Sequence, residues 1–367
     1  MSSLSDLPVE ALALIAKSLD TRSILNMAST CKSCYEVLYF IKFTRKIKFS
    51  KIASLAYINS FSNVIFDIRT KSFPRHLRCM HWLNTTRLPI IIPSNLVYLY
   101  LNHDYDYRLP DLGSSITHIF FGNSYNQPLP EKLPESLTHL FFGKQYNQLL
   151  PEILPETLIG IYFGKAFDLP LPNLPASLSR LKFGYAYNYY LPDLSHTQIT
   201  GITFGKKYNQ QLTSDLPATL KYLIFGSDYD RTLPSMKNTS ITHLYFGKYY
   251  NESLPELPMS LTHMVFGRYY NQSLPDILPP FLIHLSFGLH FNHPISALPN
   301  ASTRISVSRN YRYSLPSSRP IAPLSFTSNC SPNWNTRHYL NFEPSNNSNR
   351  RQQVYSSSSS KYIFMRR

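Results

Sequence analysis

The sequence is short of glycine, cysteine and acidic residues, and it lacks long apolar runs. Its 367 residues include 12 glycines, 4 cysteines, and 21 Asp and Glu against 36 Lys and Arg. No stretch approaches the roughly 20 consecutive apolar residues of a membrane-spanning helix. The residues after Met1 are polar and acidic, so they do not indicate a secretory signal peptide. These absences predict an intracellular, cytoplasmic protein, with the nucleus as an alternative.

The few glycines are not scattered. Nine of the twelve recur at intervals of 20 or 21 residues, at Gly122, Gly143, Gly164, Gly184, Gly205, Gly226, Gly247, Gly267 and Gly288. Self-similarity at a fixed period in this range is typical of a solenoid built from stacked coils.

The cysteines do not follow this period, as a disulfide framework would. Cys31, Cys34, Cys79 and Cys330 are unevenly spaced, which favours a reducing compartment. Cys31 and Cys34 form a single C-x-x-C without a second pair. Two cysteines on a helix are favoured over a metal or redox site.

Charge is distributed unevenly along the chain, whose formal net charge is +15. Residues 122–288 carry 12 basic and 12 acidic side chains, whereas residues 289–367 carry 10 basic and one acidic. The repeats are therefore neutral in sum. This argues against a phosphate-binding stripe on them, which would need Lys and Arg concentrated there.

Each copy carries an apolar face at fixed positions before its glycine. Leu or Ile stands six residues before it, Ile, Leu or Met three before it, and Phe directly before it in all nine copies. Side chains alternate between the two faces of a strand, so the residues three and one before the glycine share one face. The residues four and two before the glycine face the other way, and their identities vary. The pattern predicts a buried core beside an adaptable surface.

The remainder of each copy predicts a bend and an extended return. The glycine ends the strand, where a bend with positive φ is least costly. An aromatic residue follows three positions later, then Asn in seven copies and Asp in two. We expect the aromatics to stack in a column, and the Asn side chains to bond the backbone of the neighbouring coil as a ladder. Leu-Pro pairs in the return prevent a regular helix.

The first 45 residues read as three short amphipathic helices, which together bury little apolar surface. We therefore predict an α+β multidomain protein. A small N-terminal all-α module precedes a β-rich, leucine-rich-repeat-like solenoid with one short parallel strand per coil and few or no helices on its convex side.

The repeat weakens toward both ends, as expected of terminal coils. Asp67, Leu83 and Asn102 stand in the glycine position of three earlier copies, and Ser308 in that of a last one. The predicted regions are a helical module (1–45), degenerate repeats or a linker (46–115), a regular solenoid (116–316), and a basic Ser-, Asn- and Arg-rich tail (317–367). The composition of the tail favours disorder.

Two of these regions resemble known families. The units Tyr125-Asn126-Gln127-Pro128-Leu129-Pro130 and Phe291-Asn292-His293-Pro294-Ile295 are similar to the FNIP repeat, a leucine-rich-repeat relative found in amoebae and large DNA viruses. The helical module resembles an F-box, because its Leu-Pro, apolar, Cys-Lys and aromatic positions follow that motif in order and spacing. An F-box followed by FNIP repeats is a known arrangement.

The F-box resemblance implies the Skp adaptor of a cullin–RING ubiquitin ligase as a partner. The residues implied to contact it are Leu7, Pro8, Ile15, Leu19, Ile24, Leu25, Cys31, Lys32 and Tyr35. The protein would then be a non-catalytic substrate-recognition subunit, in a host cell if it is viral. The alternative is a repeat scaffold that binds a protein without ubiquitin machinery, with residues 1–45 as a cap on the first coil.

The outward strand positions are the candidate face for binding the target protein. Rows of exposed aromatic side chains often mark protein contacts. The candidates are His118, Phe120, His139, Phe141, Tyr162, Arg180, Lys182, Tyr222, His243, Tyr245, His263 and His284. The alternative is that these side chains simply pack against one another across the parallel strands.

No cofactor, metal site or enzyme activity is predicted. His243, His263 and His284 follow one another in the outward column, but no carboxylate or cysteine there completes a metal site. A catalytic constellation would break the repeat at one place, and none does. Neither a P-loop nor G-x-G-x-x-G occurs. A third interpretation, nucleic-acid binding through the basic tail, is less favoured than a solvated tail.

Overall fold

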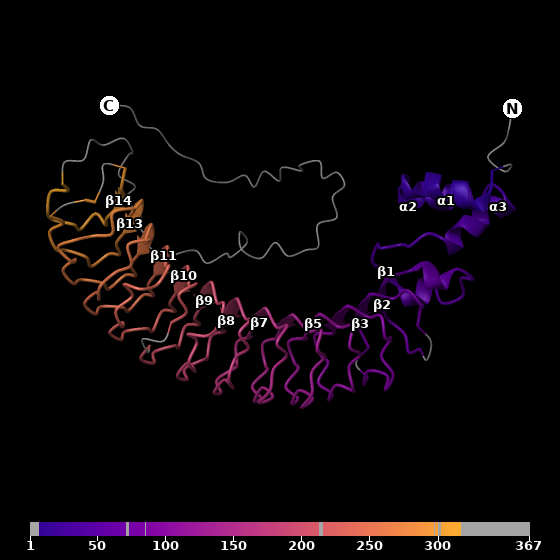
Figure 1. The fold of residues 1–367 in the computed structure, drawn as a ribbon, viewed down its shortest axis with the longest axis horizontal. Helices are drawn as coiled ribbons and strands as arrows, with labels where there is room; N and C mark the ends of the chain where they lie inside the picture. Colours follow the sequence, from indigo (N-terminus) through magenta and orange to yellow (C-terminus); the bar gives the residue numbers. More distant parts are fainter. Residues whose placement is uncertain are drawn as a thin grey trace, which may run out of the picture. The chain divides into compact units, whose positions relative to one another are not determined.

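In a computed structural model, a helical module is followed by one continuous sheet of parallel strands (Figure 1). The structure describes residues 7–70, 73–84, 86–212, 216–296, 298–299 and 302–316. The predicted tail, with Cys330, lies outside these ranges, as does Asp6, a candidate cap of the first helix.

Three helices form the module at the start of the chain. They are α1 (Val9–Lys17), α2 (Thr21–Ala28) and α3 (Lys32–Glu36), and the short 3-10 helix η2 (Val37–Tyr39) continues α3. Their small core consists of Leu12, Ala13, Ala16, Ile24, Ala28, Cys34, Val37 and Leu38, each less than 10% exposed.

Local sequence sets where the helices begin. Asp20 caps α2, because its carboxylate accepts a hydrogen bond of 2.7 Å from the Ser23 N–H. Pro8 occupies the N-cap of α1. The Sγ of Cys31 accepts a hydrogen bond of 3.3 Å from the Cys34 N–H, so the first cysteine of the C-x-x-C caps α3.

Fourteen strands follow within the described residues, and each pairs in parallel with the next in chain order. They are β1 (Ile47–Lys48), β2 (Asn63–Phe66), β3 (Cys79–Trp82), β4 (Tyr98–Leu101), β5 (His118–Phe120), β6 (His139–Phe141), β7 (Gly160–Tyr162), β8 (Arg180–Lys182), β9 (Gly201–Thr203), β10 (Tyr222–Ile224), β11 (His243–Tyr245), β12 (His263–Val265), β13 (His284–Ser286) and β14 (Arg304–Ser306). The 3-10 helices η3 (Phe49–Lys51) and η4 (Ile58–Ser60) lie among the first coils, and no helix follows η4 in the described chain. The predicted parallel coils are confirmed, including those traced faintly before residue 116, and helices among the described coils are few, as expected.

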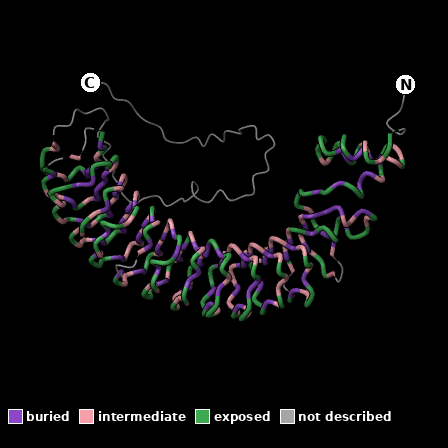
Figure 2. The backbone as a smooth tube through the Cα atoms, in the orientation of Figure 1, coloured by how far each residue is buried: buried purple, intermediate pink, exposed green. Residues whose placement is uncertain are grey.

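Each coil buries the residues that the sequence pattern assigned to its inside (Figure 2). In the coil of Gly143, Leu137 and Leu140 are 0% exposed and Phe142 is 8% exposed. The aromatic residue after the glycine is also buried, and its rings form one stack from Tyr105 to Tyr311, with centroids 5.9–6.3 Å apart. The predicted aromatic column is confirmed.

Ring spacings show that the coils fan apart away from the strand side. The outward rings of His81, Tyr100, Phe120, Phe141 and Tyr162, on successive strands, are 4.2–4.6 Å apart. The inward Phe rings, from Phe121 to Phe287, are 5.0–5.8 Å apart, and the deeper aromatic column is wider still. The strands therefore lie on the inner side of the solenoid's curve, as Figure 1 shows.

The predicted reason for the glycine column is wrong. None of the nine recurring glycines has a positive φ. A Cβ on any of them would instead lie 1.4–2.0 Å from the carbonyl oxygen of the residue in the same position of the preceding coil. Glycine is required because two backbones touch there, and a side chain would push the coils apart.

The predicted asparagine ladder is confirmed. Each ladder side chain accepts a hydrogen bond through Oδ1 from the backbone N–H of its counterpart in the next coil, as Asn126 does from Asn147 at 2.8 Å. These bonds measure 2.7–3.1 Å and connect Asp106, Asn126, Asn147, Asp168, Asn188, Asn209, Asp230, Asn251, Asn271, Asn292 and Arg312 in turn. The ladder ties every coil from β4 to β14 to its neighbour.

Candidate interaction surfaces

The helical module exposes several large apolar side chains. Among the residues that match the F-box motif, Leu7, Ile15, Leu19, Leu25 and Tyr35 are 37–42% exposed. Pro8 and Lys32 are also exposed. Leu14 (66%), Tyr39 (50%) and Phe40 (61%) extend this surface. A module of about 40 residues buries little of its own apolar surface, so the exposed side chains offer a place for a partner.

Two residues of the predicted adaptor set have other roles in this structure. Ile24 is 5% exposed and packs in the core of the module, so it is a poor contact for a partner. Cys31 is half-buried and caps α3.

The last part of the module contacts the first coil. Phe43 exchanges backbone hydrogen bonds with Ser60 and Ser62, at 2.7 and 3.0 Å. The Phe43 ring stacks on Phe61 with centroids 4.9 Å apart, and Tyr35 and Tyr39 pack edge-on against Tyr57. The module therefore closes the end of the solenoid on this side.

The sheet register brings all the outward candidates into two adjacent rows. The first row runs through the fourth residue before each glycine: His118, His139, Gly160, Arg180, Gly201, Tyr222, His243, His263 and His284. The second runs through Phe120, Phe141, Tyr162, Lys182, Thr203, Ile224, Tyr245, Val265 and Ser286. Most of these side chains are half-buried, because each lies against its neighbour on the next strand.

Rings in these rows stack face to face across the strands. Phe120 and Phe141 are 4.4 Å apart with an interplanar angle of 4°, and Phe141 and Tyr162 are 4.6 Å apart. His118 stacks on His139 at 4.5 Å, and His243 on His263 at 4.4 Å. Cross-strand packing, the alternative given above, is therefore present. It leaves ring edges, rather than ring faces, toward the outside.

Threonine holds four of the outward histidines. The Nδ1 of His139 lies 2.9 Å from the Thr138 Oγ1, which donates to the Thr117 carbonyl at 2.9 Å. Similar contacts join Thr117 to His118, Thr242 to His243 and Thr262 to His263. Because the threonine proton goes to the carbonyl, this arrangement favours a proton on Nδ1 and leaves Nε2 as an acceptor.

Burial lowers the pKa of every histidine in the outward rows. Burial, followed by the neighbouring His139, lowers the pKa of His118 to about 4. Burial also lowers the pKa values of His139, His243, His263 and His284, with smaller effects of Arg180 on His139, and of His263 and Arg304 on His284. These imidazoles are neutral at pH 7, and the described residues contain no group of three His, Cys, Asp or Glu that could hold a metal ion.

Sequence reasoning missed the beginning of the outward rows. Tyr98 pairs in register with His118, and Tyr100 with Phe120. His81 stacks on Tyr100 at 4.2 Å and contacts Asn63 Oδ1 at 3.1 Å. The signal was present, because Asn102 was already assigned to the glycine position. Leu99 and Leu101, three and one residues before it, therefore face inward, and the alternate residues face outward.

A second feature that was missed lies on the turn directly after the strands, which we call the turn edge. It comprises the first two residues after each glycine, among them Lys144, Lys165, Tyr185, Lys206, Lys207, Lys248, Tyr249, Arg268, Tyr269 and His290. The Lys248 ammonium lies 4.5 Å from the Tyr249 ring centroid, and Lys206 lies 5.4 Å from that of Tyr185. Tyr249, Tyr269 and His290 stack on one another at 5.3 and 4.8 Å.

Helices in the described part of the chain are all too short, or too polar, to cross a lipid bilayer.

Parallel single-strand coils around an apolar core, with helices confined to the start, define a leucine-rich-repeat-like solenoid carrying a helical N-terminal module.

Family comparisons match both parts. The F-box domain family matches residues 4–46, and the FNIP Repeat family matches residues 108–145, 125–166, 146–186, 197–228 and 270–307. The chain is an F-box and FNIP repeat-containing protein, as its sequence predicted. F-box domains suggest ubiquitin-ligase substrate adaptors, leucine-rich-repeat-like repeats suggest protein binding, and both families are generally non-catalytic.

Two solved structures are similar to this chain, and the first of them shares the fold. YopM from Yersinia enterocolitica WA-314 is 23% identical, with a TM-score of 0.53, over 68% of this chain and 55% of that one. CroV588, described as a novel circular LRR protein, is 25% identical, with a TM-score of 0.46, over 70% of this chain and 51% of that one. The matches thus span about half the length of these proteins. A search of curated proteins found no match.

Proposed function

We propose that the protein is the substrate-recognition subunit of a Skp–cullin–RING ubiquitin ligase. The module would bind the Skp adaptor, and the outward strand rows would hold the target protein. The protein would place its target and contribute no chemistry of its own. This function requires an intracellular location, which suits the free thiols of Cys31, Cys34 and Cys79.

The observation that carries the proposal is the exposed apolar surface of α1 and α2. If residues 1–45 served only as a cap, the apolar side chains of these helices should pack against the first coil. Instead, the contacts with the first coil come from the segment after α2, whereas Ile15, Leu19 and Leu25 remain about 40% exposed. Exposed apolar clusters of this kind mark protein interfaces.

The test is co-purification of the full-length chain with a purified Skp adaptor. We expect a complex with the unaltered chain and its loss in the double variant Leu7→Ala, Pro8→Ala. A matched control, Ile153→Ala with Ile277→Ala, removes two apolar side chains that are each 84% exposed on the return legs, and it should bind normally. Absence of a complex with the unaltered chain, or equal loss in the control, would contradict the proposal.

The alternative function, a scaffold with residues 1–45 as a cap, is supported by the pairing of Phe43 with Phe61. Phe43→Ala should lower the melting temperature of the solenoid but leave adaptor binding intact if the module has both roles. If Phe43→Ala lowers stability and no adaptor binds to any variant, the scaffold is the better description.

A further inference from the structure

The repeats are neutral in sum, but the structure separates their charges by position in the coil. We call the residues from five before the glycine to two after it the strand side, and the remainder the return leg. Between residues 122 and 288, the strand side holds nine of the twelve basic residues: Lys144, Lys165, Arg180, Lys182, Lys206, Lys207, Lys221, Lys248 and Arg268. It holds one of the twelve acidic residues, Asp228.

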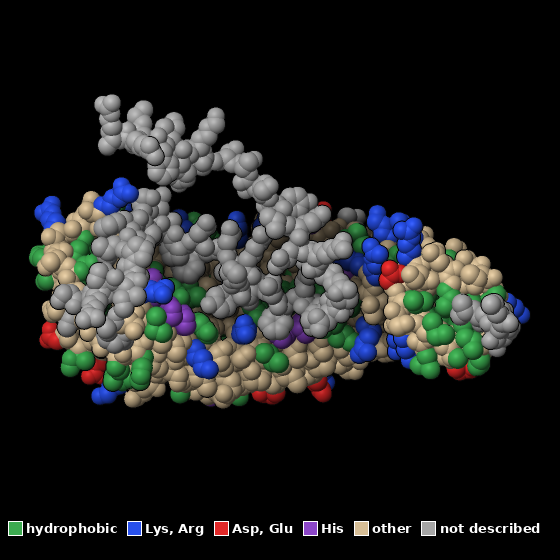
Figure 3. All heavy atoms as spheres, turned by 90° about the horizontal axis from the view of Figure 1, so that it is seen from above, with side chains coloured by type: hydrophobic (Ala, Val, Ile, Leu, Met, Phe, Trp, Pro, Cys, Tyr) green, Lys and Arg blue, Asp and Glu red, His purple; other side chains and the backbone are tan. Residues whose placement is uncertain are grey.

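The return legs carry the opposite charge. Ten acidic residues lie there within the part of the chain that the structure describes: Glu131, Glu135, Glu152, Glu156, Asp168, Asp193, Asp230, Glu252, Glu256 and Asp276. A neutral total therefore hides a basic strand side. Figure 3 looks down on the strand side, and it shows Lys, Arg and His side chains along this face with acidic side chains toward its margins.

We infer that the strand side, together with its turn edge, binds an acidic, extended segment of a protein. This inference rests on the proposed function and specifies the kind of target that the repeats select. Basic side chains at successive coils attract carboxylates, and the acidic return legs steer such a segment to one side of the solenoid.

The stacked aromatic rings favour the same ligand. An aromatic ring is electronegative on its face and electropositive at its edge. Phe120, Phe141 and Tyr162 cover one another's faces at 4.4–4.6 Å, so they present edges, which suit carboxylates. Tyr249 and Tyr269 are likewise stacked on each other. Single-stranded nucleic acid needs free ring faces on which its bases stack, and these rows offer few.

Lys182 supplies a site in the middle of the face. It is half-buried in the second outward row, beside Tyr162 and Thr203 on the neighbouring strands. Its row contains no acidic side chain, so a carboxylate from outside would be its natural counter-ion. The chain's own tail is a poor occupant, because residues 317–367 carry seven basic residues and one acidic residue, Glu343.

The test measures binding of a fluorescent Glu-rich peptide to the full-length chain by anisotropy. We expect binding that weakens with added salt and falls at least about tenfold in two charge-reversal variants, Lys206→Glu with Lys207→Glu and Lys248→Glu with Arg268→Glu. All four side chains are exposed, so the variants should fold. The matched control, Lys132→Glu with Lys237→Glu, makes the same charge change on the return legs. It should bind normally, and the tail is unchanged in every variant.

Three outcomes would overturn the inference. They are equal weakening in the control, no binding by the unaltered chain, and tighter binding of a single-stranded RNA of equal charge that depends on the same residues. Adaptor co-purification with the charge variants separates the two proposals. If the adaptor still binds while the peptide does not, only the ligand assignment fails. If the adaptor never binds, the proposed function fails, and the peptide result stands by itself.

Discussion

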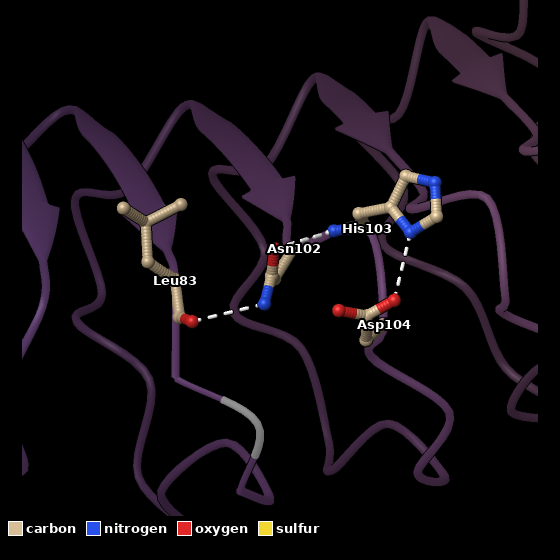
Figure 4. Close-up of polar contacts among 4 residues, drawn as sticks. All are labelled: Leu83, Asn102, His103 and Asp104. Carbon is tan, nitrogen blue, oxygen red and sulfur yellow. Dashed lines mark hydrogen bonds and ion pairs between the residues drawn. The ribbon is translucent and has the colours of Figure 1, made fainter.

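The coils before β5 and the coils after it fill the same position in different ways. At the ends of β2, β3 and β4 that position holds Asp67, Leu83 and Asn102. Figure 4 shows how Asn102 acts there: its Nδ2 donates to the Leu83 carbonyl at 3.0 Å, and its Oδ1 accepts from the His103 N–H at 2.6 Å. At the nine recurring glycines, from Gly122 to Gly288, no side chain fits.

The difference shows what makes the later coils regular. A side chain can bridge one coil to the previous one only where the backbones leave room for it. Once glycine removes the Cβ, the two backbones touch directly, and spacing is set by backbone contact. The early coils are accordingly uneven, with 16 residues from Asp67 to Leu83 and 19 from Leu83 to Asn102, whereas the later ones keep to 20 or 21.

The largest expected effect comes from breaking this backbone contact. In Gly205→Ala the new Cβ would lie 1.4 Å from the Gly184 carbonyl oxygen, so the coils must separate. We expect a loss of about 3 kcal/mol or more in the free energy of unfolding, measured by urea denaturation.

Two substitutions act as controls for that prediction. Gly201→Ala adds the same methyl four residues earlier, where the nearest atom is Tyr222 Cβ at 3.7 Å, and it should cost far less. Asn102→Ala, in the equivalent position of an early coil, should cost only about 1 kcal/mol for its hydrogen bonds. Similar losses in all three would refute the backbone-contact explanation.

The tyrosine column also differs between the early and the later coils, in whether the buried hydroxyl has a hydrogen-bond partner. Tyr105, in an early coil, accepts a hydrogen bond of 3.3 Å from the Leu88 N–H, so Tyr105→Phe should cost about 1–2 kcal/mol. The buried Tyr208 hydroxyl has no hydrogen-bond partner among the described residues. Tyr208→Phe should therefore be neutral or slightly stabilising. The same column already contains phenylalanine in two coils, at Phe167 and Phe291. Paired thermal melts of the two variants would show whether the difference holds.

Loss of one ladder hydrogen bond should have a smaller effect on stability than loss of the Tyr105 hydrogen bond. Asn209→Ala removes the acceptor for the Asp230 N–H, at 3.0 Å, and should cost about 0.5–1 kcal/mol because the site is partly exposed. Asn209→Asp keeps the acceptor oxygen and should be tolerated. Hydrogen exchange at the Asp230 amide would report the change directly, and faster exchange in both variants would contradict the role of Oδ1.

Acidification should produce the smallest change near neutral pH. His118 has its pKa lowered from 6.5 to about 4, so between these values the unfolded chain binds a proton that the folded chain does not. Stability is unaffected above about pH 6.5 and falls as the pH drops toward 4. His118→Gln should flatten this decline in melting temperature, and an unchanged pH profile would show that His118 is not responsible.

Much of this solenoid could be predicted from the sequence because each coil has the same residue types at the same positions. Nine copies agree on the inward residues, so Leu140, Phe142 and Tyr146 were placed correctly, and Asn147 was given its ladder role. The reason for the glycines was not accessible, because a missing Cβ looks the same whether φ is positive or a neighbour is too close. Only the three-dimensional arrangement of the coils distinguishes a positive φ from a close neighbour.

The candidate surfaces were only partly predictable. The outward rows follow from alternation along the strand, but the charge separation disappears when residues are summed over a whole repeat. Lys206 and Glu156 cancel in a total, although one lies on the turn edge and the other on a return leg. Ile24 was assigned to the adaptor contact by its motif position, since sequence does not reveal which side of a short helix is covered.

The ladder also bears on how such a chain can change over generations. Each of its bonds joins a side-chain oxygen to a backbone N–H, which every residue except proline has. Excision or duplication of one complete coil would thus bring together two ends that already fit. The inner surface can gain or lose width in steps of one strand, about 4.8 Å. Exchange of coils would also reorder the outward side chains while the fold stays the same.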